Sequence, residues 1–241
     1  MSEPGSLIRS LSGRMTARNF HSHVINEIGV GIISGKYPIG TNLPNDADMI
    51  SHFNVSRTVL REALKTLESK GLVEARPKIG TRVSARSRWN HFDWQVLAWH
   101  YIAGPDESFW ANLNEVRMSL EPVAAAKAAE NRTADDVRMM QYWIQQMENS
   151  IDSAQNFALA DFELHRAIAD ASISPFMRSI SGVIELAHAA TYEKIVSAPS
   201  KSLIDGQLIS HGKLVAAIES GNSTSASNQM KAIIKFESKS S

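Results

Sequence analysis

The chain has 241 residues, of which 43% are hydrophobic and 21% are charged, so it can form one or two apolar cores and is not expected to be disordered. It has no cysteine, which excludes disulfide bonds, thiolate zinc sites and cysteine nucleophiles, and no apolar run approaches the roughly 18 residues of a membrane-spanning helix. The net charge of zero divides into +6 over residues 1–88 (13 Lys/Arg against 7 Asp/Glu) and −6 over residues 89–241 (12 against 18). We therefore expect a soluble, cytoplasmic protein without a membrane partner, whose first part binds a polyanion.

The first 85 residues follow the pattern of a winged helix-turn-helix. Residues 1–19 are polar and without period, and we interpret them as a flexible tail. Apolar residues at helical spacing then predict three helices, and short extended runs predict a hairpin. The predicted elements are helices from Phe20 to Ser34, Asn45 to Phe53 and Ser56 to Gly71, strands over 72–76 and 81–84, and a turn over 77–80. This order is typical of a winged DNA-binding domain, here residues 20–85.

Beyond residue 85 the chain shows only helical periodicity. We expect a linker helix over 86–101 and an all-α, antiparallel helical bundle over 102–241 that senses a ligand, so that the fold class is mainly α. Trp89, Trp94 and Trp99 are spread around the linker helix, and we interpret them as packing the two domains together. The predicted helices are 87–101, 106–131, 134–152, 154–171, 175–197, 202–220 and 223–238.

The third predicted helix presents cations beside its apolar stripe. Arg57, Arg61 and Lys65 fall within about 80° of one another on a helical wheel, and Thr58 lies just beyond them. Arginine suits guanine edges, whereas lysine suits phosphate. The alternative is an ordinary solvated helix face. The residues predicted to contact DNA are Ser56, Arg57, Thr58, Arg61 and Lys65 on this helix, with Lys78 and Gly80 at the hairpin tip.

Two further patterns point to a small ligand in the bundle. Asp161 and His165 are four residues apart on one helix and, with His211 from another helix, could bind zinc, manganese or nickel; the alternative is a surface Asp–His pair. Arg117 belongs to an otherwise apolar helix face, where a guanidinium is costly unless it meets an anion. We predict that Arg117 binds a ligand carboxylate, and the alternative is an ion pair with Glu121.

The N-terminal motifs resemble those of the GntR family of bacterial regulators. The resemblance rests on Leu-Pro-Asn-Asp-Ala-Asp-Met-Ile from Leu43, Val-Ser-Arg-Thr-Val-Leu-Arg-Glu-Ala-Leu-Lys-Thr-Leu from Val55, Gly-Leu-Val-Glu from Gly71 and Gly-Thr-Arg-Val from Gly80. It implies that Arg57, Arg61 and Gly80 contact DNA. The sequence departs from the family at Ala47, where an arginine is frequent, and the resemblance implies that one base or phosphate contact is missing there.

The C-terminal part resembles the effector domain of the FadR subfamily, called FCD, over roughly residues 100–236. The resemblance rests on Glu-Val-Arg-Met-Ser-Leu-Glu ending at Glu121, Asp-Phe-Glu-Leu-His ending at His165, and Ser-His at His211 followed by Leu-Val-Ala-Ala-Ile-Glu-Ser-Gly. It implies a ligand cavity beside a divalent metal. A third family histidine is replaced by Ile233, so the metal either binds through three residues with water or effector, or is lost and leaves hydrogen-bonding groups. Residues 88–99 resemble the linker of galactonate-type repressors of sugar-acid catabolism, which implies a sugar acid as effector.

Taken together, these patterns predict a transcription repressor and not an enzyme. A homodimer would bind a palindromic operator of double-stranded DNA, and a small carboxylate in the bundle would change its affinity. Two alternatives remain open. One is a metal-dependent helical enzyme that uses Asp161, His165 and His211, although no nucleophile elbow or phosphate loop accompanies them. The other is a DNA-binding protein without an effector.

Overall fold

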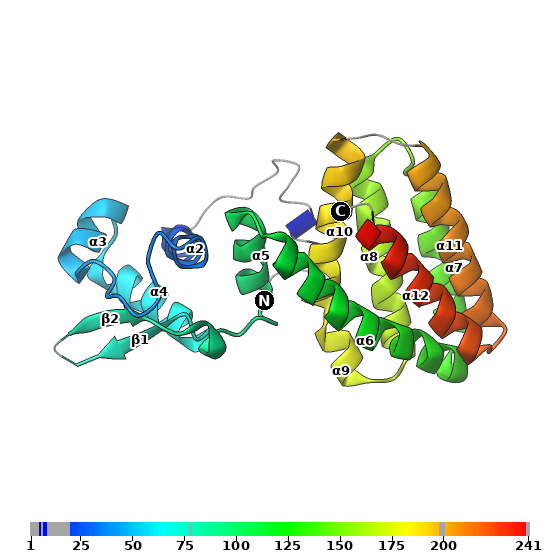
Figure 1. The fold of residues 1–241 in the computed structure, drawn as a ribbon, viewed down its shortest axis with the longest axis horizontal. Coiled ribbons are helices and arrows are strands. Elements are labelled where there is room, and N and C mark those ends of the chain that lie inside the picture. Colours follow the sequence, from blue (N-terminus) through cyan, green and yellow to red (C-terminus); the bar gives the residue numbers. More distant parts are fainter. Residues whose placement is uncertain (1–4, 6, 9–19, 78, 198–200, 240–241) are drawn as a thin grey trace. The chain divides into compact units, whose positions relative to one another are not determined.

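A computed structural model describes residues 5, 7–8, 20–77, 79–197 and 201–239 (Figure 1). The described residues divide into two compact units. The winged-helix unit comprises residues 20–106, and the helical unit comprises residues 107–239 together with Gly5, Leu7 and Ile8. This architecture confirms the predicted fold class.

Three helices and a hairpin build the first part of the winged-helix unit. Side-chain caps set two of the helix starts: Asn45 accepts a hydrogen bond from the Asp48 N–H, and Ser56 accepts one from the Val59 N–H. The hairpin is antiparallel, with Val73 opposite Val83. The elements are α2 (Phe20–Ile33), α3 (Asp46–Phe53), α4 (Arg57–Ser69), β1 (Val73–Arg76) and β2 (Gly80–Val83). Their apolar faces meet in one core, and Leu60, Ala63 and Leu67 supply the stripe predicted for α4.

The turn after α4 requires a glycine. Gly71 has a φ of 78°, and a Cβ atom there would lie 2.0 Å from the carbonyl oxygen of Arg88. The chain therefore returns close to the end of α4 after the hairpin. It continues there as a short 3-10 helix, η1 (Arg86–Arg88).

The linker region differs from the single helix predicted over 87–101. A turn separates η1 from α5 (Trp94–Ala103), because the Asp93 side chain caps α5 by accepting from the N–H groups of Gln95 and Val96. The interpretation of the tryptophans is corrected as well. Trp89 and Trp99 are buried within the core of the winged-helix unit, whereas Trp94 is 38% exposed.

Seven helices form the helical unit within its described residues. Thr133 and Asp136 make a capping box at the start of α7, and Ser153 caps α8. The helix predicted over 175–197 is divided at Ile180. The helices are α6 (Glu107–Asn131), α7 (Ala134–Glu148), α8 (Ala154–Ala171), α9 (Pro175–Ser179), α10 (Ser181–Ser197), α11 (Lys201–Glu219) and α12 (Ser223–Lys239).

Helix α8 packs against three of the long helices of this unit. These are α6, α7 and α10, while α12 lies along α6 and α11 (Figure 1). The core is apolar over most of its length, with residues such as Phe157, Leu164 and Ile218 fully buried. A polar cluster interrupts this apolar packing.

The described part of the N-terminal tail departs from the prediction of flexibility. Leu7 and Ile8 are 8% and 0% exposed, and the Leu7 N–H donates a hydrogen bond of 2.6 Å to Oε1 of Glu185 on α10. Burial of these apolar side chains explains why the segment belongs to the helical unit. The rest of residues 1–19 lies outside the described residues.

Candidate functional site

The predicted DNA-reading residues of α4 lie on an exposed face. Arg57, Thr58, Arg61 and Lys65 are all exposed, and Ser56 caps the helix just before them. Lys65 forms a surface ion pair of 2.9 Å with Glu62, a contact worth little in water. The arginines are therefore presented at the N-terminal turns of α4, where a recognition helix reads bases. Contact with DNA stays a prediction.

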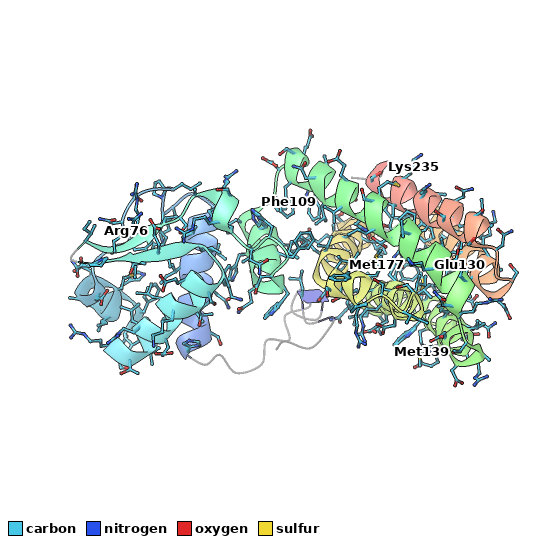
Figure 2. All side chains as sticks on the ribbon, turned by 90° about the horizontal axis from the view of Figure 1, so that it is seen from below. Arg76, Phe109, Glu130, Met139, Met177 and Lys235 are labelled. Atoms are coloured by element: carbon cyan, nitrogen blue, oxygen red, sulfur yellow. The ribbon has the colours of Figure 1, made fainter. Side chains whose placement is uncertain are left out.

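The hairpin can serve as the wing. Gly80 opens β2 with a φ of 106°, a conformation that glycine adopts without strain, whereas Lys78 lies outside the described residues. Arg76 on β1 (Figure 2) pairs with Glu74 at 2.6 Å. Arg82 on β2 donates through Nε to the carbonyl of Gly40 at 2.7 Å. The hairpin therefore carries two further cations, which the sequence analysis did not select.

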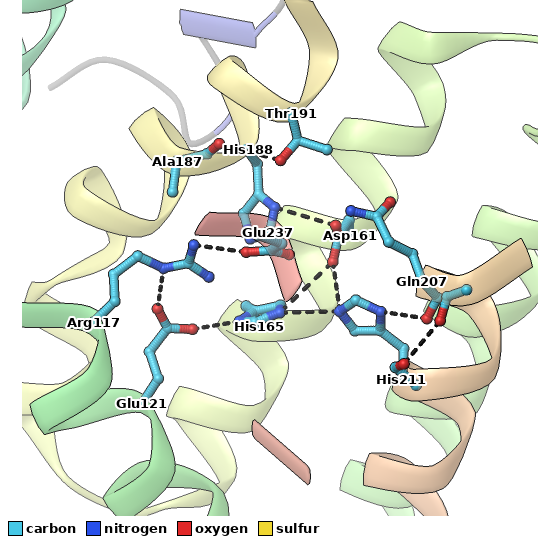
Figure 3. A network of polar contacts seen from close by, with 12 residues as sticks. Arg117, Glu121, Asp161, His165, Ala187, His188, Thr191, Gln207, His211 and Glu237 are labelled. Carbon is cyan, nitrogen blue, oxygen red and sulfur yellow. Dashed lines mark hydrogen bonds and ion pairs between the residues drawn. The ribbon is translucent and has the colours of Figure 1, made fainter. Parts of the chain in front are cut away.

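The second candidate site is a buried polar cluster in the helical unit (Figure 3). Its side chains come from five helices that surround one point: α6, α8, α10, α11 and α12. Every member is at most 6% exposed. The members are Arg117, Glu121, Asp161, His165, His188, Thr191, Gln207, His211 and Glu237.

Asp161 contacts three histidines in this cluster. Its Oδ1 lies 3.0 Å from Nε2 of His211 and 3.6 Å from Nε2 of His165, and its Oδ2 lies 3.2 Å from Nδ1 of His188. Asp161 and His165 are 0% and 2% exposed, so the alternative of a surface pair is wrong. The structure brings the three predicted residues Asp161, His165 and His211 together.

The outer hydrogen bonds of the two predicted histidines fix their tautomers. Nδ1 of His165 lies 2.5 Å from the Glu121 carboxylate, and Nδ1 of His211 lies 2.8 Å from the backbone carbonyl of Gln207. Both partners are acceptors, so each neutral ring carries its proton on Nδ1 and presents a lone pair on Nε2. The two Nε2 atoms are 3.2 Å apart. Two lone pairs at that distance need a proton or a cation between them.

Arg117 is ion-paired on two sides. Its Nε lies 2.5 Å from Oε1 of Glu121, and its Nη1 lies 2.7 Å from Oε2 of Glu237. The pair with Glu121, which the sequence analysis weighed as the alternative, is therefore present. The guanidinium is 1% exposed, and Nη2 has no hydrogen-bond partner among the described residues. The guanidinium can therefore donate through Nη2 to a further acceptor.

The pKa shifts follow from these contacts. Burial would raise the pKa of Glu121, but Arg117 and His165 outweigh burial and hold this pKa well below its usual range. Burial lowers the pKa of His165, whereas Asp161 outweighs burial at His211 and raises the pKa of that imidazole to about 9. A cation-free cluster therefore holds a proton on His211 next to Asp161.

The donor set fits a divalent cation. Ligand atoms of Asp161, His165, His211 and Glu237 all lie within 4.8 Å of one another. Imidazole nitrogens and carboxylate oxygens are suitable ligands for zinc, manganese and nickel. The outer bonds to Glu121 and the Gln207 carbonyl are the kind that orient metal-binding histidines.

Sequence reasoning missed four members of the cluster, namely His188, Thr191, Gln207 and Glu237. Glu237 lies one helical turn after Ile233 on α12, so a search for acidic residues four positions from the replaced histidine would have found it. Ile233 itself is buried in the apolar core. His188 reaches Asp161 from α10, and no motif in the sequence marked it.

The fold is that of a winged helix joined to an all-helical domain, the arrangement of a DNA-binding regulator with a ligand-sensing domain. Sequence profiles agree: the one described as "Bacterial regulatory proteins, gntR family" matches residues 20–83, and the FCD domain matches residues 112–236. The chain belongs to the GntR family of transcription regulators, in its FadR-like branch with an FCD domain.

Individual relatives cover most of the chain. The galactonate operon transcriptional repressor of Escherichia coli (strain K12) is 29% identical over 73% of this chain and 77% of its own length. The regulator YieP of the same organism is 30% identical over 94% of this chain and 97% of its own length. The solved structure of Lar, described as controlling expression of the Listeria monocytogenes agr system, is similar in fold, with a TM-score of 0.66 at 17% identity. The match covers 94% of this chain and 98% of that one. No helix in the described part of the chain is long and apolar enough to cross a membrane.

Proposed function

We propose that the protein is a cytoplasmic, homodimeric repressor that binds a palindromic operator and is released from it by a small carboxylate. The observation that carries the proposal is the presence, in one chain, of exposed cations on α4 and a buried cluster of carboxylates, imidazoles and one guanidinium. A two-fold dimer matches the symmetry of a palindromic site. The family consists of regulators, which supports a role in binding and not in catalysis.

DNA recognition is assigned to α4 and the wing. Arg57 and Arg61 would donate to base edges near the start of the helix, and Lys65 would neutralise a phosphate. Ser56 and Thr58 would also contact the DNA, and Lys78 and Gly80 would do so from the wing. The exposed positions of the α4 residues support this assignment.

Effector recognition is assigned to the buried cluster. Asp161, His165 and His211 would hold a zinc, manganese or nickel ion, which would supply a Lewis acid for carboxylate and hydroxyl oxygens. The unpartnered Nη2 of Arg117 would donate to the effector carboxylate. The name of the galactonate operon repressor supports a sugar acid as the ligand class.

A thermal-shift screen of the purified full-length protein tests the effector assignment. Sugar acids and small dicarboxylates are added with and without zinc or manganese, and a specific acid is expected to raise the melting temperature by several degrees. The same acid should release DNA that the protein has selected from a random library. A protein that binds selected DNA but responds to no acid would contradict the effector assignment and leave the DNA-binding assignment intact.

A further inference from the structure

Glu237 occupies an unusual position for a carboxylate. It lies in the last turn of α12, whose residues Met230, Ile233 and Ile234 are buried in the apolar core. Its side chain is buried as well, with Oε2 2.7 Å from Nη1 of Arg117. A ligand atom of the same residue lies within 4.8 Å of those of Asp161, His165 and His211. Glu237 therefore lies between the guanidinium and the candidate cation ligands.

We propose that Glu237 is an internal stand-in for the effector carboxylate. In the effector-free protein its carboxylate occupies the fourth ligand position beside Asp161, His165 and His211, and an effector carboxylate takes that position by displacing it. This inference rests on the proposed function, because it requires both the cation and the acidic effector.

The distances are compatible with a shared cation. Ligand atoms around a tetrahedral first-row metal are about 3.4 Å apart, since each bond is about 2.1 Å. The separations in the cluster, within 4.8 Å, need only a small inward movement. A carboxylate has two oxygens, and Arg117 holds one of them. An effector carboxylate that binds both a guanidinium and a cation would make the same pair of contacts.

The other two carboxylates of the cluster are less able to leave. Glu121 bonds to Arg117 and to His165, each at 2.5 Å, from the middle of α6. Asp161 contacts three histidines from the middle of α8. Glu237 lies two residues before the end of α12 at Lys239. The last carbonyls of a helix lack intrahelical partners, so unwinding a final turn costs least.

Charge balance explains why displacement is required. Glu121, Asp161 and Glu237 carry three negative charges against one positive charge on Arg117, so this buried set has a net charge of −2 when its histidines are neutral. A divalent cation neutralises that charge. An additional effector carboxylate would make the buried site negative again, which is costly. If Glu237 moves to water as the effector enters, neutrality is kept.

Chemical rescue with cobalt(II) as the only metal tests this proposal on the full-length protein. Wild-type protein is expected to bind cobalt with a visible spectrum, and Glu237→Ala is expected to weaken binding on the order of 10–100-fold and to change that spectrum. Added acetate should restore both in Glu237→Ala, because it refills the vacated position. The same acetate should leave the wild type unchanged, since the tethered Glu237 has the higher effective concentration. Ile233→Ala is the matched control, because it opens space one turn earlier on α12 without removing a carboxylate, and acetate should have no effect on it.

The outcomes distinguish the stand-in role of Glu237 from metal binding by Asp161, His165 and His211. Cobalt binding with the same affinity and spectrum in wild type and Glu237→Ala would overturn the stand-in role and leave the three-residue site standing. Wild-type protein that binds no cobalt would overturn the metal assignment and the stand-in role together, whereas DNA binding would be unaffected. If Glu237→Ala does not fold, Glu237→Gln keeps the shape of the side chain, and undiminished cobalt affinity in that variant overturns the proposal.

Discussion

The indole of Trp99 lies directly against Gly29. A Cβ atom on Gly29 would be 2.6 Å from Cδ2 of the ring, and the indole N–H donates a hydrogen bond of 2.9 Å to Asn26 on the same helix. Helix α5 is thereby fixed to α2. Because α5 is the last helix before the helical unit, this contact makes the end of the linker a rigid part of the winged-helix unit.

Substitution of Gly29 is expected to disturb that contact. Gly29→Ala should lower the free energy of unfolding by about 1–3 kcal/mol, because the added methyl group overlaps a ring held by packing and a hydrogen bond. Urea denaturation checks this value. Gly212→Ala is the control, since a Cβ there meets no atom within 4 Å, and this helical substitution should be neutral or slightly stabilising. Equal effects of the two changes would contradict the predicted overlap.

The α4 cations should differ in what they contribute to DNA binding. Arg57→Ala or Arg61→Ala should weaken binding to the selected operator by about 1–3 kcal/mol and relax its specificity, whereas Lys65→Ala should reduce the salt slope by about one. Fluorescence anisotropy over a range of salt concentrations measures both quantities. Lys127→Ala on the exposed surface of α6 is the control. The assignment fails if the arginine variants bind like that control.

Removal of Arg117 should strongly destabilise the helical unit. Arg117→Ala leaves the buried carboxylates of Glu121 and Glu237 without their cation, so the free energy of unfolding should fall by about 3–5 kcal/mol. Adding Glu237→Gln should recover part of this loss, because one of the two stranded charges is removed. Denaturation followed by circular dichroism compares the three proteins. A double variant less stable than Arg117→Ala would refute this explanation.

The stability of the winged-helix unit should depend on pH through His100. Burial, together with His91 and Arg86, lowers the pKa of this imidazole from 6.5 to about 4. Between pH 6.5 and pH 4, His100 binds a proton in the unfolded chain but stays neutral in the folded chain. The free energy of unfolding should therefore fall as the pH decreases from 6.5 towards 4. His100→Gln should make this decline shallower, and His52→Gln, at an exposed position, is the control. Urea denaturation at pH 7 and pH 5 measures the difference.

Local signals were sufficient to predict most of the fold. The Ser56 cap, the apolar stripe of α4 and the Thr133 capping box each act over a few residues, so the sequence states them directly. The break before α5 was missed because helical periodicity continues through Trp89 and Trp99, while the turn depends on the Asp93 cap and on burial in the first core.

The buried cluster was harder to predict because its contacts join distant parts of the chain. Arg117 and Glu237 are 120 positions apart, and His165 and His211 are 46 apart. The four-residue spacing of Asp161 and His165 is visible in the sequence. The positions of α10 and α12 beside the cluster depend on how the helices pack. His188 and Glu237 could therefore be assigned only from the structure.

The buried pair Leu7 and Ile8 changes the connectivity of the molecule. The helical unit begins at these residues and resumes at Glu107, so the DNA-binding unit is an insertion in it and not a head attached at one end. The chain therefore connects the two units at two points of the sequence, one before Phe20 and one at Asp106.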